Sequence, residues 1–93
     1  MSIPSQREMK ELNYKSSIDE YLNRGNYKKA LEYCNIAISE GFKSSKIYER
    51  RADAHFNLRE YSNARKDYEE ASKADPYDNW YKEKIAQLKS QGF

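Results

Sequence analysis

The chain has 93 residues, of which 38% are hydrophobic and 34% charged, and its formal net charge at pH 7 is only +2. This length predicts one small domain with a thin hydrophobic core. Seventeen basic and fifteen acidic residues are interleaved, so the sequence offers no basic face of the kind that binds nucleic acid. No apolar run approaches the roughly 20 residues that cross a bilayer, and no signal peptide is expected after Met1.

The first expected helix follows Ser5. Ser5 and Glu8 have the spacing of a capping box, in which each side chain accepts a hydrogen bond from the other residue's backbone amide. A helix end is expected at Asn23–Gly25, because Gly25 readily adopts the positive φ that closes many helices. The apolar residues expected along this helix are Met9, Leu12, Ile18, Tyr21 and Leu22.

Two further helices are predicted by apolar residues that recur every three or four positions. The second helix carries Tyr27, Ala30, Leu31, Cys34, Ala37 and Ile38, and it ends at Gly41. After a short link through residues 43–45, the third helix carries Ile47, Tyr48, Ala52 and Phe56.

The fourth helix ends at Asp75–Pro76, because proline cannot continue a helix but fits the first turn of the next one. Its expected apolar face consists of Tyr61, Ala64, Tyr68, Ala71 and Ala74. A fifth helix is expected from about Asn79 to Gln91, with Tyr81, Ile85 and Leu88 facing inward. No segment alternates apolar and polar residues as a strand does, so we predict an all-α fold of five helices.

The sequence repeats itself at an offset of 34 residues. Identical residues at this offset are Tyr14/Tyr48, Asp19/Asp53, Asn23/Asn57, Tyr27/Tyr61, Ala30/Ala64 and Ala37/Ala71. A fixed period of this length indicates stacked helical hairpins, none of which can bury its apolar face alone.

The repeated unit resembles the tetratricopeptide repeat (TPR). Residues 11–44 and 45–78 resemble two such repeats, and residues 79–91 resemble a capping helix, within one domain over residues 1–93. The family's signature positions are occupied in the second copy by Tyr48, Ala52, Tyr61, Ala64, Tyr68, Ala71 and Pro76, and in the first by Tyr14, Tyr21, Gly25, Tyr27, Ala30 and Ala37. The departures are Ser17 and Arg51 in place of leucine, Phe42 in place of proline and His55 in place of an aromatic residue.

The resemblance implies a right-handed superhelical stack of antiparallel helix hairpins, whose first helices line a concave groove for a peptide or helix of a partner protein. The partner-binding residues that it implies are Lys15, Asp19, Asn23, Lys46, Arg50, Asp53, Asn57, Trp80 and Lys84. Leu22, Glu49, Phe56 and Gln87 would lie on the same face. Each repeated Asp stands one turn before its Asn, so the pair could offer donors and acceptors to a bound peptide backbone. The alternative is that these are ordinary solvated and helix-end residues.

Some relatives clamp the terminal carboxylate of a chaperone tail with lysine and asparagine side chains. Here Lys15 and Lys84 stand at two clamp positions, but the clamp asparagines are replaced by Asp19 and Arg50 and a lysine by Trp80. The full carboxylate clamp is therefore absent, since an aspartate repels a carboxylate. A modified clamp of Lys15, Arg50 and Lys84 stays open, because arginine binds carboxylates through two hydrogen bonds.

No enzyme, metal site or cofactor is expected. His55 is the only histidine and has no partner histidine or cysteine pair, so we interpret it as a packing residue. Cys34 is the only cysteine and lies on an apolar stripe, which indicates a buried thiol in a reducing compartment such as the cytoplasm.

The sequence therefore predicts a non-enzymatic adaptor, with a co-chaperone-like role open. The alternative is a structural or self-associating helical repeat protein. In that case Trp80, Tyr81 and Phe93 of the C-terminal aromatic cluster, which also includes Tyr77, would lie at a protein contact.

Overall fold

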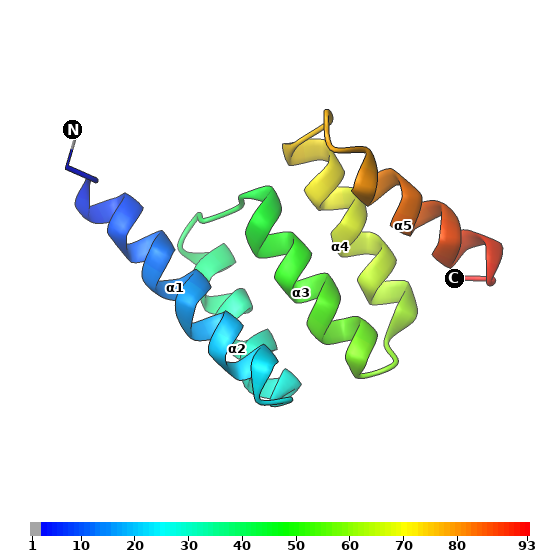
Figure 1. Ribbon diagram of the computed structural model, residues 1–93, viewed down its shortest axis with the longest axis horizontal. Helices are drawn as coiled ribbons and strands as arrows, with labels where there is room; N and C mark the ends of the chain where they lie inside the picture. The colour runs from blue at the N-terminus through cyan, green and yellow to red at the C-terminus, as the bar shows by residue number, and fades with distance from the viewer. Residues whose placement is uncertain (1–2) are drawn as a thin grey trace.

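The structure is a computed structural model that describes residues 3–93, and this part of the chain is entirely helices and short connections (Figure 1). The helices are α1 (Gln6–Asn23), α2 (Tyr27–Ser39), α3 (Ser45–Asn57), α4 (Tyr61–Ala74) and α5 (Asn79–Ser90). They form an elongated body of 44 × 30 × 21 Å. The predicted all-α fold of five helices is confirmed. None of the helices in residues 3–93 is long and apolar enough to cross a membrane.

Local sequence explains where the helices begin and end. At the start of α1, Ser5 Oγ accepts from Glu8 N at 3.1 Å and Glu8 Oε2 accepts from Ser5 N at 3.4 Å, which is the predicted capping box. Side-chain oxygens also cap α2, α3 and α5, from Asn26, Ser44 and Asp78 respectively. The chain then reverses after α1 through Gly25, whose φ of 76° lies in the left-handed region that glycine adopts without strain.

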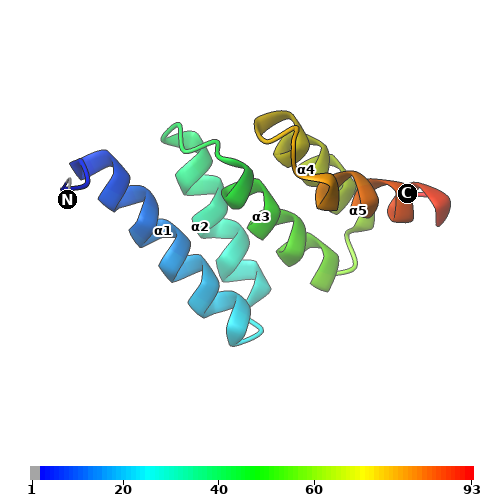
Figure 2. The same cartoon turned by 45° about the horizontal axis from the view of Figure 1, so that its top comes forward.

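Each helix packs against the next, so the chain builds a stack from one end to the other. The α1–α2 and α3–α4 pairs form antiparallel hairpins, α2 also packs against α3, and α5 covers the outer side of α4 (Figure 2). Small residues stand at the helix crossings, where they let backbones approach closely. The fully buried alanines are Ala30, Ala37, Ala52, Ala54, Ala64 and Ala71.

The core has two parts that meet at Ile38. One part is centred on Ile18, Cys34 and Ile47, between α1, α2 and α3. The other contains Tyr48, Tyr68, Tyr81 and Leu88, between α3, α4 and α5. Ile38 packs against both, so the two hairpins share one continuous core.

The apolar residues of α1 are less buried than their pattern indicates. Only Ile18 is fully buried, and Met9 and Leu12 are about half exposed. These two residues lie about 180° and 120° around the helix from Ile18, so they turn away from α2. Conversely Phe42, which replaces the family's proline, is buried against Tyr14 with ring centroids 5.8 Å apart.

Arg51 stands where the family usually has leucine, and it forms an ion pair inside the stack. The sequence did not predict this ion pair. The Arg51 guanidinium donates to both carboxylate oxygens of Asp67 on α4, at 2.9 and 2.7 Å, and to Asn35 Oδ1 on α2 at 3.1 Å. Asp67 is only 3% exposed. His55 lies beside this pair, with Nδ1 3.0 Å from Glu60 Oε1 and Nε2 3.6 Å from Asp67 Oδ2, so its role is polar as well as packing.

We predict that Asp67→Ala lowers the free energy of unfolding by about 3 kcal/mol, because it leaves the Arg51 guanidinium without its buried partner. Urea denaturation followed by circular dichroism measures this change. The double variant R51L/D67L should recover most of the loss, since an apolar pair needs no charge compensation. As a surface control, Glu70→Gln removes only the exposed Lys73–Glu70 pair and should cost less than about 0.5 kcal/mol. Equal losses for D67A and E70Q would show that the buried pair does not stabilise the stack.

Candidate functional site

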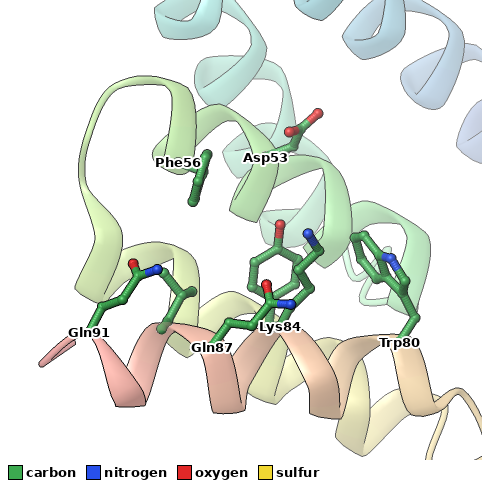
Figure 3. Close-up of a pocket in the computed structure, with 8 residues that line it drawn as sticks. Asp53, Phe56, Trp80, Lys84, Gln87 and Gln91 are labelled. Carbon is green, nitrogen blue, oxygen red and sulfur yellow. The ribbon is translucent and has the colours of Figure 1, made fainter.

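Two adjoining pockets lie along one face of the molecule and are lined by α1, α3, α4 and α5. The C-terminal pocket, of about 220 Å³, is lined by Asp53, Phe56, Tyr68, Trp80, Lys84, Gln87, Leu88 and Gln91 (Figure 3). The N-terminal pocket, of about 320 Å³, is lined by Asp19, Leu22, Glu49, Arg50, Asp53, Tyr68 and Trp80. Asp53, Tyr68 and Trp80 line both, so we treat the two pockets as one groove.

Aromatic side chains form the apolar part of the groove. Trp80 is 42% exposed and stands at the start of α5, where it makes edge-on contacts with Tyr68 and Tyr81, each with ring centroids 5.6 Å apart. Phe56 is 45% exposed at the far end of the C-terminal pocket and packs edge-on against Tyr61. These contacts hold large apolar surfaces in place while leaving them open to solvent.

Asp19 and Arg50 form an ion pair across the groove. The Arg50 Nε donates to Asp19 Oδ1 at 2.7 Å and Nη2 donates to Oδ2 at 3.0 Å, which ties α1 to α3. The third nitrogen, Nη1, donates to the backbone oxygen of Lys46 at 3.0 Å. Arg50 is thus already bound to a carboxylate, and this contact argues against a modified clamp that uses Arg50 to bind a partner's terminus.

The repeated Asp–Asn pairs differ between the two copies. On α3, Asn57 Nδ2 donates to the backbone oxygen of Asp53 at 2.8 Å and to its Oδ1 at 3.3 Å. On α1, Asp19 is bound by Arg50 instead, and Asn23 makes no side-chain hydrogen bond within residues 3–93. The identical residues therefore have different environments, because only Asp19 faces an arginine of the next hairpin.

The pKa of Asp53 is raised above its ordinary value. Partial desolvation by the surrounding groove is the largest cause, and the negative charge of Glu49 adds to it, while Lys84 acts in the opposite direction. Glu49 itself accepts a hydrogen bond from Tyr81 Oη at 2.7 Å and lies 3.6 Å from the Lys46 ammonium. Burial likewise raises the pKa of Tyr68 to about 12, so this phenol stays neutral beside Asp53.

The structure brings some predicted site residues together and leaves others apart. Asp19, Arg50, Asp53, Trp80 and Lys84 line the groove, as do Leu22, Glu49, Phe56 and Gln87. Lys15, Asn23, Lys46 and Asn57 line neither pocket. Tyr68 and Leu88 line the groove but were expected only in the core, and their place at its floor follows from the stacking of α5 on α4.

The C-terminal aromatic cluster does not act as one surface. Tyr81 is fully buried, so the expectation that it lies at a protein contact is wrong: its ring fills the core between α3, α4 and α5. Phe93 packs against Tyr61, with ring centroids 4.8 Å apart. Tyr77 is 93% exposed. Tyr77 and Trp80 are the most exposed members of the cluster, and Phe93 stays 37% exposed despite its contact with Tyr61.

No cluster of metal-ligating side chains is found in residues 3–93. Cys34 is fully buried, and burial raises the pKa of its thiol to about 12. The thiol is therefore protonated at neutral pH, which is the inert form of cysteine.

Comparisons with known proteins agree with the helical-repeat fold. Residues 45–78 match the family model described as the tetratricopeptide repeat. Among solved structures, the NMR structure of the first TPR domain of the human RPAP3 protein is similar, with a TM-score of 0.75 at 23% sequence identity. The similarity covers 83% of this chain and 61% of that chain, so it extends over less than two thirds of the other's length. A search of curated protein sequences gave no match.

The predicted resemblance is confirmed. Residues 45–78 match the tetratricopeptide repeat, and the fold of the chain is similar to that of a TPR domain.

We predict that Asp53→Asn stabilises the protein at neutral pH, by less than about 1 kcal/mol because solvent in the groove screens the charge. The raised pKa of Asp53 means that folding disfavours its charged carboxylate. The charge therefore lowers the free energy of unfolding at pH values above the folded-state pKa. It has no such effect below the unfolded-state pKa, where the group is protonated in both states. The gain should therefore shrink as pH falls through that interval. Asparagine keeps the oxygen that accepts from Asn57.

Urea denaturation at stepwise lower pH measures this difference. Glu83→Gln is the matched control, because Glu83 is an exposed carboxylate of α5 that lines neither pocket. A D53N gain that persists unchanged into acid would show that Asp53 carries no electrostatic cost.

Proposed function

We propose that the chain is a non-enzymatic adaptor that binds an extended segment or a helix of a partner protein in the groove. The observation that carries this proposal is the junction of the two pockets at Asp53, Tyr68 and Trp80. This junction places an apolar surface next to a carboxylate. The helices that carry these side chains have already made their own backbone hydrogen bonds. A ligand can therefore bind through side chains without rearranging the stack.

Trp80 is the anchor of the proposed interface. Tryptophan is enriched among residues that dominate binding energy, because it buries a large area and loses little freedom. Here Tyr68 and Tyr81 already fix the orientation of the indole, which lowers the entropy cost of binding.

The domain organisation is part of the proposal. Residues 11–44 act as a first repeat, residues 45–78 as a second and residues 79–91 as a capping helix within a domain of residues 1–93; residues 1 and 2 lie outside the described structure. A reducing, cytoplasmic setting is supported by Cys34, which is buried and forms no disulfide in residues 3–93.

A co-chaperone role through a carboxylate clamp has less support than a general adaptor role. Arg50 is held by Asp19, and the other two members of the modified clamp, Lys15 and Lys84, do not line a common pocket. An incoming terminal carboxylate would also approach Glu49 and Asp53, which repel it.

We predict that Trp80→Ala weakens binding of a purified partner by about 2 kcal/mol, roughly thirtyfold in Kd. The partner is first captured from a cell extract, and its direct binding is then measured by calorimetry. Tyr77→Ala is the matched control, since it removes an exposed aromatic residue outside both pockets. A D53N/N57A variant tests the same groove without removing a packed ring, and circular dichroism checks that all variants stay folded. Binding that is lost in Y77A but kept in W80A and D53N/N57A would contradict the proposed groove.

Self-association is the second candidate, and the 93% exposed Tyr77 is the observation that favours it. If Tyr77 and Trp80 mediate a homodimer, sedimentation velocity should show a mass that rises with protein concentration, and Y77A should abolish the rise. A monomer at every concentration tested would exclude this candidate.

A further inference from the structure

We propose that the groove selects a partner segment with an arginine or lysine side chain next to an apolar one. The basic side chain pairs with Asp53 in the N-terminal pocket, beside Glu49. The apolar side chain enters the C-terminal pocket against Phe56, Leu88 and Trp80. This inference rests on the proposed function, because it names the chemistry of a ligand for the same groove.

The charge of the N-terminal pocket is the first argument. Three carboxylates line this pocket, from Asp19, Glu49 and Asp53, against the single guanidinium of Arg50. Asp19 and Arg50 neutralise each other through two short hydrogen bonds. The remaining charge is negative, although the whole chain is weakly basic. A cationic side chain complements it.

Asp53 is the carboxylate that still lacks a cation. Glu49 has the Lys46 ammonium at 3.6 Å and the Tyr81 hydroxyl at 2.7 Å. The side chain of Asp53 accepts only from the neutral amide of Asn57, and no ion pair joins it to any side chain in residues 3–93. An incoming cation would supply this missing counter-charge.

The other nearby cations do not fill this position. The Lys84 ammonium lies 5.2 Å from the centre of the Trp80 ring and forms no ion pair in the described part of the chain. Lys15 is 3.9 Å from Glu11 and lines neither pocket. The contact of Lys84 with Trp80 also shows that this indole can accept a cation on its face, as it would a guanidinium.

The shape of the groove is the second argument. Asp53 lies where the pockets meet, with Phe56 on one side and the indole of Trp80 on the other, as Figure 3 shows. A side chain that reaches Asp53 therefore leaves its neighbour over the apolar pocket. A segment with two adjacent carboxylates would instead bring like charges together beside Glu49.

Selection from a library of short random peptides displayed on phage tests the inference. Enriched peptides are synthesised, and NMR chemical shifts of backbone amides in α1, α3 and α5 locate their binding site. We expect enrichment of arginine or lysine next to an apolar residue. Replacing that arginine by citrulline, which keeps its shape but loses its charge, should weaken binding about tenfold.

Variants identify the partner of the basic side chain. In D53N the arginine and citrulline peptides should bind with equal affinity, whereas E83Q should keep the tenfold difference. Lys84→Gln should tighten arginine-peptide binding, since it removes a competing cation from the groove.

Two sets of results would overturn the inference. In the first set, peptides bind the groove without a basic residue, or their preference for arginine over citrulline survives in D53N. Either result would reject the basic ligand but would still support binding of a partner in the groove. Acidic peptides that need Lys84 would do the same. Selected peptides that bind outside the groove, or no enrichment at all, would reject both the basic ligand and the proposed function.

Discussion

The close approach of helices at alanine positions is the constraint on which the rest of the structure depends. Six alanines are fully buried where helices cross, and larger residues at these positions would push the axes apart. The tyrosines of the repeat fill the wider spaces, as Tyr48, Tyr68 and Tyr81 do between α3, α4 and α5. This combination places side chains of α1, α3 and α5 along one face, and the groove follows from that placement.

Two neighbouring arginines on α3 each form an ion pair with an aspartate, and the two aspartates lie on different helices. Arg51 reaches inward to Asp67 on α4, and Arg50 reaches across the groove to Asp19 on α1. Adjacent residues on a helix point about 100° apart, so the pair can bind both neighbouring layers at once. The Arg51–Asp67 pair thus ties α3 to α4 within the second hairpin, and the Arg50–Asp19 pair joins the two hairpins. The second pair also uses the arginine that a modified clamp would need for its ligand.

The sequence predicts the helices well because their signals are local. The Ser5–Glu8 capping box, the helix-closing Gly25 and the repeat of 34 residues each require only spacing along the chain. The pairing of Arg51 with Asp67 could not be predicted in this way, since it depends on which side chains meet across α3 and α4. Asp19 and Asp53 are likewise equivalent in the repeat, and only the tertiary structure gives one of them an arginine.

The two terminal helices of the stack, α1 and α5, both contribute side chains to the groove. The backbone of α5 approaches only α4, and that of α1 approaches only α2 and α3, while α3 contacts helices on both sides. Terminal elements of such arrays open locally at lower free energy than central ones. A ligand held between α1 and α5 therefore connects the two most easily opened segments, which are most distant in the sequence. If the proposed ligand binds there, it would couple the opening of α1 to that of α5, so that amide protection would rise at both ends of the described chain together.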